Sequence, residues 1–326
     1  MEDIDNPRIL LVIGNGFDLD MGLKTSYEDF IQSVFFKSEL SGKLPPLYSE
    51  ADSLNIFDYL QREKDIKGWI DVEGALAQLA TRTVRTIKEG NIVTIKAIAT
   101  QKERETFQAL RLRLADHLRH IDYASIKRHC TALKLLQAIN KSQTEVISFN
   151  YTPFDYLFKE ICNETQYFKS SFIHGSLNEY DELGNNPSII LGIQDEVDID
   201  NSYSFLVKSH SEFYKSYHIK RKLHDADIIL FFGHSLGPTD YSYFADFFKD
   251  LCNNNSYSDK EKLVRIFTYD EKAREDILNQ LRAMNDKKTK MLYENNDFGI
   301  YRTDGSDKNK INKFVSELRD RAIYYN

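Results

Sequence analysis

The sequence predicts an α/β fold: a parallel sheet flanked by helices, with a helical insertion. Three observations predict it. Short apolar runs of strand length alternate with amphipathic helical patterns, as in parallel α/β sheets. The first of these runs ends in a glycine turn of the kind that opens many nucleotide-binding domains. Residues 40–142, which follow that turn and the next helix, carry mainly long helical patterns.

The strands are expected where apolar runs suit burial on both faces of a sheet. The first is Ile9–Ile13, and the others are Glu145–Phe149, Ser170–Ile173, Ile228–Phe232 and Leu263–Thr268, with Ser188–Ile193 as a candidate sixth. Helices are expected at Ser26–Phe36, Asp240–Leu251, Glu271–Met284 and Lys310–Ala322. Residues 1–39 and 143–326 therefore form the predicted α/β nucleotide-binding domain. The predicted insertion, residues 40–142, has helical patterns at Val72–Lys88, Lys102–His120 and Ile126–Ile139.

Composition excludes several classes of protein. The net charge of −7 argues against a general nucleic-acid surface. The apolar runs are far shorter than the roughly 20 residues that cross a bilayer, and the acidic start MEDIDNPR does not resemble a signal peptide. The three cysteines (Cys130, Cys162 and Cys252) lack the spacing of zinc ligands. We therefore expect a cytoplasmic protein without a structural metal.

The turn Gly14-Asn15-Gly16 directly follows the first strand. Glycines without a Cβ let the backbone turn sharply and approach a ligand, and phosphates bind backbone N–H groups at such turns. The dinucleotide fingerprint is incomplete, because Leu19 stands where a third glycine is required, and no P-loop lysine follows. The turn is thus either a nucleotide site or a tight turn only.

Three further strand ends carry polar residues that could perform chemistry. They read Asn150-Tyr151-Thr152, His174-Gly175-Ser176 and Gly233-His234-Ser235, the last followed by Asp240. In an open parallel sheet such loops gather at one edge, where ligands bind. The four loops are therefore predicted to converge on one site.

Each polar residue has a chemical and a structural interpretation. His174 can act as an acid or base near neutral pH, or can simply bond a backbone carbonyl at a turn. Asn150 can hold a ribose hydroxyl or a water, or can cap the following helix. Asp18 and Asp240 can contact ribose or cap their own turns.

Residues 233–237 read GHSLG and match the letters of the GxSxG nucleophile elbow, so a serine hydrolase is an alternative. The α/β-hydrolase triad places its histidine after the serine in the chain. No histidine follows Ser235, so a triad in that order is impossible.

Five motifs resemble those of the bacterial abortive-infection AbiH family of phage-defence proteins. They are GNGFDLDMGLKTSYEDF, GWIDVE at 68–73, FNYT at 149–152, HGS at 174–176 and GHSLGPTDYSYF at 233–244. More distantly, the pattern is similar to the Rossmann-like fold of NAD-binding sirtuins. Thr152 replaces an aspartate of that pattern, and the cysteine pairs of the sirtuin zinc module are missing.

The resemblance implies NAD as a substrate, without a metal, and an enzyme of the NAD-glycohydrolase type. Asn150 and His174 stand at the sirtuin catalytic positions. The remaining implied contacts to NAD are Gly14, Asn15, Gly16, Phe17, Asp18, Thr152, Gly233, His234, Ser235 and Asp240.

Two rival functions stay open. A sensor would bind NAD or ADP-ribose without cleaving it and act through assembly with its own copies or with a partner defence protein. A nuclease or phosphoesterase would need a compact cluster of metal-binding carboxylates, which the sequence does not display. The role of Glu73, within GWIDVE, is not evident beyond a core ion pair.

Overall fold

The computed structural model describes residues 7–42, 54–68, 70–139, 144–153, 157, 168–178, 188–253 and 261–323. The chain divides into two compact units. The first, here called the sheet unit, comprises Met1–Leu23, Asp122–Ile173 and Ser216–Asn326. The second, the helical unit, comprises Lys24–Ile121 and His174–Lys215.

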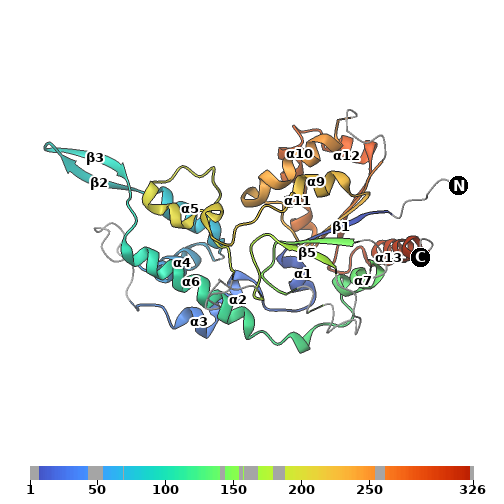
Figure 1. Ribbon diagram of the computed structural model, residues 1–326, viewed down its shortest axis with the longest axis horizontal. Coiled ribbons are helices and arrows are strands. Elements are labelled where there is room, and N and C mark those ends of the chain that lie inside the picture. The colour runs from blue at the N-terminus through green and yellow to red at the C-terminus, as the bar shows by residue number, and fades with distance from the viewer. Residues whose placement is uncertain are drawn as a thin grey trace. The chain divides into compact units, whose positions relative to one another are not determined.

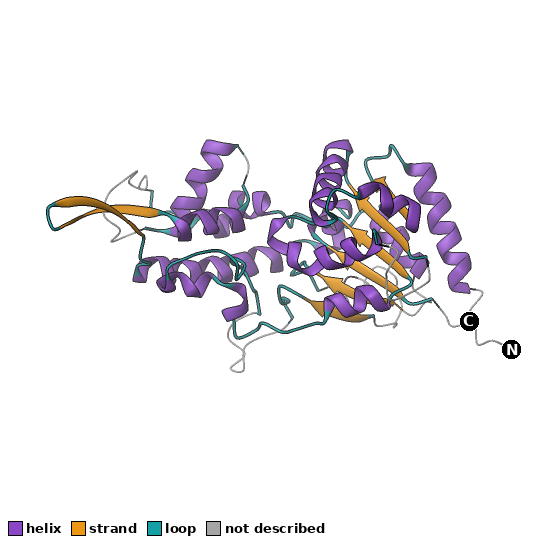
Figure 2. Ribbon diagram, turned by 90° about the horizontal axis from the view of Figure 1, so that it is seen from above, coloured by secondary structure: helices purple, strands orange, loops and turns teal. Residues whose placement is uncertain are grey.

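The sheet unit is built on a six-stranded parallel sheet with the order β5-β4-β1-β6-β7-β8, which confirms the predicted fold class (Figures 1 and 2). Its strands are β1 (Ile9–Ile13), β4 (Thr144–Ser148), β5 (Lys169–Phe172), β6 (Ile228–Phe232), β7 (Leu263–Thr268) and β8 (Asp297–Arg302). Every residue of β1, β6 and β7 is buried, as expected for central strands covered on both faces.

Helices cover both faces of this sheet (Figure 2). Side chains of α9, α10, α11 and α12 share one apolar core with the strands. On the other face, Phe17 of α1 packs on Phe232 and Phe314 of α13 packs on Phe267, while α7 packs against α13. The helices of this unit are α1 (Asn15–Asp20), α7 (Thr131–Ile139), α9 (Ile219–Asp225), α10 (Tyr241–Leu251), α11 (Glu271–Met284), α12 (Thr289–Asn295) and α13 (Lys308–Ile323).

The sixth strand is not the one expected from the sequence. Ser188–Ile193 forms no strand and makes only an isolated bridge, Ile193 to Val207, while the sixth strand is β8. β8 is an edge strand in which only one of six residues is fully buried. Its mixed sequence, DFGIYR, therefore lacks the continuous apolar run that marks a buried strand.

The helical unit contains a two-stranded antiparallel hairpin and a set of helices. The elements are α2 (Tyr27–Gln32), α3 (Val34–Lys37), α4 (Ile56–Lys67), α5 (Val72–Thr81), β2 (Thr83–Lys88), β3 (Asn91–Lys96) and α6 (Gln101–Arg119), followed by 3₁₀ helices at Asn201–Leu206 and Lys208–His210. The helix expected over Val72–Lys88 ends at Thr81, because the sequence TVRTIK is rich in β-branched residues and pairs with β3 instead.

The division into units differs from the expected boundaries in three places. Residues 24–39, expected in the α/β domain, belong to the helical unit. The helix α7, expected in the insertion, belongs to the sheet unit because it packs on α13. Residues 174–215, expected in the α/β domain, belong to the helical unit. Within the described part of the chain, no helix has the length and apolar character required to cross a membrane. Cys130 and Cys252 are free thiols, and Cys162 lies outside the described residues.

Candidate functional site

Two glycine-bearing loops meet at the carboxyl ends of the neighbouring strands β1 and β6. The Gly14 N–H donates to the Phe232 carbonyl and the Gly16 N–H donates to the Gly233 carbonyl, each with an N···O distance of 3.0 Å. A Cβ on Gly16 would lie 2.6 Å from the Cα of Gly233, closer than real side chains come. The glycines are therefore required by the contact between the two loops, whether or not a ligand also approaches them.

A buried carboxylate joins the end of β4 to this crossing. Asp18, in α1, is only 1% exposed. The side-chain amide of Asn150 donates to Asp18 Oδ1 and to the Gly14 carbonyl, each at a distance of 3.0 Å. The Thr152 hydroxyl donates to Asp18 Oδ2. These bonds satisfy the polar groups that the fold buries here. We call Gly14, Gly16, Asp18, Asn150, Thr152, Gly233 and His234 the strand-end cluster.

His234 lies beside this carboxylate network and uses both of its ring nitrogens. Nδ1 accepts the Leu236 N–H over 3.0 Å, and Nε2 lies 3.4 Å from an Asp240 carboxylate oxygen. In a neutral ring with Nδ1 as acceptor, Nε2 carries the proton and faces Asp240. The edge of the ring packs on Phe149, with centroids 4.4 Å apart.

The turn after His234 does not have the conformation of a nucleophile elbow. The residue with positive φ is Leu236 (51°), not Ser235. The Ser235 hydroxyl accepts the Gly237 N–H at 3.3 Å, and His234 Nδ1 is already occupied by Leu236. The GxSxG letters thus form a local turn at the end of β6, which disfavours the serine-hydrolase alternative.

The other predicted contacts divide by exposure. Phe17 is fully buried and packs edge-to-face on Phe232, 5.4 Å between centroids, so it is a core residue. Asn15 and Ser235 are exposed. They are the predicted site residues of this unit whose side chains reach solvent most.

His174 belongs to the helical unit, where it contacts a buried ion pair. Lys208 Nζ lies 2.9 Å from Glu73 Oε2 and 3.3 Å from His174 Nε2. The three side chains are all buried, with Lys208 only 3% exposed. A lysine ammonium has only donors, so His174 Nε2 accepts from it and carries no proton in this arrangement.

The backbone around His174 is held by the segment 188–190. The His174 carbonyl accepts the Ile190 N–H over 2.8 Å. Gly175 has φ of 78°, and a Cβ there would overlap the Ser188 carbonyl oxygen. The glycine after the histidine is therefore required by packing. Its close contact with Ser188 helps to fix the backbone position from which the His174 side chain extends.

Sequence reasoning did not find Lys208. It lies on a 3₁₀ helix far along the chain from Glu73, and no spacing or periodicity links the two. Glu73 was marked only by its motif, and the structure pairs it with a buried cation. Trp69 of the same motif lies outside the described residues.

The two sites offer different chemistry. The strand-end cluster holds a buried carboxylate beneath a loop crossing, and the helical unit places a lysine cation against an imidazole. Among the residues that the structure describes, no group of three or more His, Cys, Asp or Glu side chains is arranged to hold a metal ion.

Comparisons with known proteins identify the family. No curated protein and no solved structure matches the chain. A family model described as bacteriophage abortive infection AbiH matches residues 10–258. This match covers both units' motif-bearing segments, from β1 through the turn after β6 and the helix α10. The chain therefore belongs to the bacteriophage abortive infection AbiH family of anti-phage defence proteins.

Proposed function

We propose that this AbiH protein binds NAD at the strand-end cluster and hydrolyses its nicotinamide–ribose bond. The observation that carries the proposal is the strand order. Numbered in chain order, the six strands lie 3-2-1-4-5-6, the order of Rossmann-like dinucleotide-binding sheets. Ligands of such sheets bind where the order reverses, outside the carboxyl ends of the strands.

In this protein the order reverses between β1 and β6. That is the place where the Gly14–Gly16 turn meets Gly233, and where Asn15 and Ser235 are exposed. In the proposal, backbone groups and these two side chains contact the nucleotide. Asp18, Asn150 and Thr152 act as positioning residues, because their hydrogen bonds hold the glycine turn in place.

The chemical step is the attack of water on the ribose carbon that carries nicotinamide. The carbon–nitrogen bond breaks, nicotinamide leaves with the bonding electron pair, and the water proton passes to a base. The family resemblance implies His174 as this base, and its Nε2 is an acceptor in the helical unit, where Lys208 Nζ lies 3.3 Å away. In that unit Glu73 holds the lysine cation, with Nζ 2.9 Å from Oε2.

The test is nicotinamide release from NAD by the purified full-length chain, together with NAD binding measured by calorimetry. His174→Ala should reduce turnover about a hundredfold or more, the usual loss for a general base, and should still bind NAD. Asn150→Ala should reduce both binding and turnover. His210→Ala, an exposed histidine of the same unit, is the matched control and should behave as wild type. Equal turnover by wild type and His174→Ala would remove His174 as the base.

A second candidate is a sensor that binds NAD or ADP-ribose without cleaving it. One observation favours it: the amide of Asn150 and both ring nitrogens of His234 are already bonded within the fold. Saturable NAD binding with no nicotinamide release by the wild type would select the sensor. Absence of NAD binding would exclude both candidates.

A further inference from the structure

The sheet unit contains a cavity of about 420 Å³ whose lining includes five lysine and arginine residues. It lies among the end of α1, the segment before α7, and the start of α13 with the loop that precedes it. The aspartate, lysine and arginine residues of its lining are Asp20, Lys127, Arg128, Lys134, Arg302 and Lys308. We call it the basic cavity. Its volume falls within the roughly 300–1,000 Å³ of small-molecule sites.

Most of the cavity's positive charge is not neutralised by the protein. Lys127, Arg128, Lys134 and Lys308 form no ion pair with any residue in the described part of the chain. The whole chain carries a net charge of −7, so this gathering of cations runs against its overall balance. Clustered like charges repel each other, and such a cluster is stabilised when an anion occupies it.

The one carboxylate in the lining has a structural task. Asp20 accepts the Ala132 N–H over 2.7 Å and so binds the first turn of α7. Burial raises the pKa of the Asp20 carboxyl, although the hydrogen bonds from α7 oppose this. A single partly buried carboxylate that caps a helix does not balance four cations.

The start of α13 adds a second argument. This sixteen-residue helix begins at Lys308, directly after Asp307, whose carboxylate is already bonded to Arg302 and Lys310, and it has no acidic residue within its first turn. A cation at a helix N-terminus interacts unfavourably with the helix dipole, typically by about 0.3–1 kcal/mol. An anion bound beside Lys308 would interact favourably with both the lysine and the helix end.

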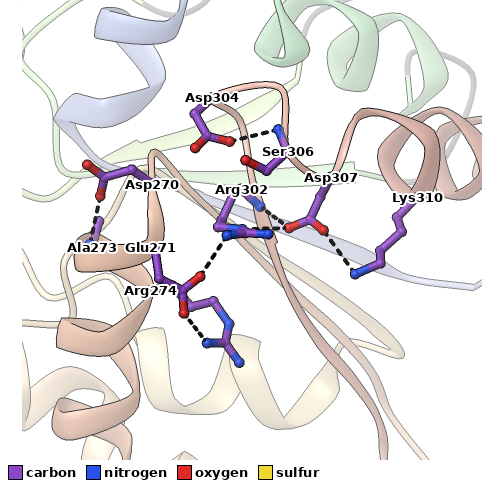
Figure 3. A network of polar contacts seen from close by, with 9 residues as sticks. All are labelled: Asp270, Glu271, Ala273, Arg274, Arg302, Asp304, Ser306, Asp307 and Lys310. Carbon is purple, nitrogen blue, oxygen red and sulfur yellow. Dashed lines mark hydrogen bonds and ion pairs between the residues drawn. The ribbon is translucent and has the colours of Figure 1, made fainter.

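Arg302, which lines the cavity, takes part in a network of ion pairs and hydrogen bonds (Figure 3). Arg302 Nη1 lies 2.8 Å from Glu271, and its Nε lies 3.1 Å from Asp307. Asp304 accepts the Ser306 N–H over 2.8 Å and fixes the loop between β8 and α13. Arg302 Nη2 makes no bond to another described residue, so it stays able to donate to a ligand.

We propose that the basic cavity binds a small molecule with two or more phosphate groups, of the class of nucleoside diphosphates and triphosphates. Four cations without an ion-pair partner among the described residues, opposed in the lining by Asp20 alone, match the charge of such an oligophosphate, and Arg302 supplies a directional donor. The volume exceeds what a single phosphate fills. This site goes beyond the proposed NAD cleavage, because its lining shares no residue with the strand-end cluster.

The experiment measures binding of pyrophosphate and of ADP to the full chain by calorimetry at low ionic strength. The test variant is Lys127→Ala/Lys308→Ala, which removes two exposed cations of the cavity. The control is Lys290→Ala/Lys313→Ala, which removes the same charge from exposed positions of α12 and α13 outside the lining. Wild type and control should bind both probes, and the test variant should bind them about tenfold more weakly or worse.

Three outcomes would overturn the proposal. The first is no saturable binding of either probe by the wild type. The second is an equal loss in the test and control variants, which would indicate attraction to net charge alone. The third is tighter, strongly salt-dependent binding of a short DNA or RNA oligonucleotide lost in the same test variant, which would make nucleic acid the occupant.

A separate arm keeps this proposal distinct from the NAD proposal. Asn150→Ala alters the strand-end cluster and leaves the basic cavity untouched, so pyrophosphate binding should be unchanged. If Asn150→Ala abolishes pyrophosphate binding while Lys127→Ala/Lys308→Ala does not, the phosphate site is the strand-end cluster and the cavity proposal fails. Failure of nicotinamide release has no bearing on the cavity.

Discussion

The strand-end cluster and the basic cavity lie in one unit and use their polar groups in opposite ways. In the cluster, the polar side chains bond to other parts of the chain: Asn150 joins Gly14 to Asp18, and His234 joins Leu236 to Asp240. In the cavity, the lysines find no ion-pair partner in the described part of the chain. The polar side chains of the first region are bonded within the fold, whereas these lysines are not held by a carboxylate of any described residue.

This difference shows that a sequence motif can reflect a structural requirement of the fold as well as a binding site. The motif residues of the cluster make close backbone contacts and satisfy buried polar groups. These structural roles alone explain much of why these residue types stand at these positions. The cavity has no motif, yet three of its lysines, Lys127, Lys134 and Lys308, form no ion pair with a described residue. A substitution should therefore cost much stability in the cluster and little in the cavity.

Gly233→Ala should have the largest effect on stability. A Cβ there would lie 2.3 Å from the Gly16 carbonyl carbon and from the Phe17 nitrogen, and neither backbone can move without breaking the loop crossing. We expect a loss of about 4 kcal/mol or more in the free energy of unfolding, or failure to fold. Urea unfolding followed by circular dichroism measures it.

Gly68→Ala is the matched control for this change. Gly68 has a similar φ of 73°, and a Cβ there meets no atom within 4 Å. It should lose only the cost of a left-handed alanine, about 1–2 kcal/mol. Equal losses at Gly233 and Gly68 would show that the loop crossing is not as tight as described.

Lys208→Met should come next, because it leaves Glu73 buried without its cation. Breaking one partner of a buried ion pair costs about 3 kcal/mol or somewhat more. The double variant Glu73→Gln/Lys208→Met should recover part of this loss, since no uncompensated charge remains. Denaturant unfolding of the two single variants and the double variant gives the coupling. Additive losses would mean that the two side chains do not interact.

Asp307→Asn should cost about 2 kcal/mol at neutral pH, because Asp307 accepts charged hydrogen bonds from Arg302 and Lys310. Burial alone would raise the pKa of Asp307, but the bonds from Lys310 and Arg302 outweigh it and lower the pKa from 3.8 to about 2. A lowered pKa in the folded state stabilises the protein above the unfolded value. The advantage of wild type over the variant should therefore be full above about pH 4 and vanish as the pH falls through about 2.

Unfolding measured at several pH values between 7 and 2 checks this window. Asp286→Asn, which removes an exposed partner of Lys249, is the control and should change stability measurably less. A difference between wild type and Asp307→Asn that stays constant with pH would contradict the assignment of the effect to ionisation.

The predictable part of the fold was the part made of continuous apolar runs. Ile9–Ile13, Ile228–Phe232 and Leu263–Thr268 are strands with the predicted bounds, and Glu271–Met284 is a helix with the predicted bounds. The edge strand β8 and the β2–β3 hairpin escaped prediction because their residues are mostly not buried and carry mixed patterns. Short-range periodicity reports burial, so elements that bury little leave little signal.

The sequence predicted several residues of the candidate site, but not all of the contacts that they make. The sequence marked Gly14, Asn150, His174 and Gly233 through strand ends and glycine turns, and three of these loops meet in the sheet unit. His174 instead contacts Lys208, which no local pattern indicates. The basic cavity draws on three separate segments of the chain, so no spacing in the sequence could reveal it.

The smallest effect is expected in the basic cavity. Lys127→Ala/Lys308→Ala should change the free energy of unfolding by no more than about 0.5 kcal/mol at neutral pH, because both side chains are exposed and neither has an ion-pair partner among the described residues. Salt gives the sharper test. In wild type, added salt screens the repulsion between the cavity's cations and should raise the midpoint of thermal unfolding. The double variant has less repulsion to screen, so its midpoint should rise less than that of Lys290→Ala/Lys313→Ala over the same salt range. A variant that loses several kcal/mol would mean that these lysines serve the fold after all, and the contrast between the two regions would disappear.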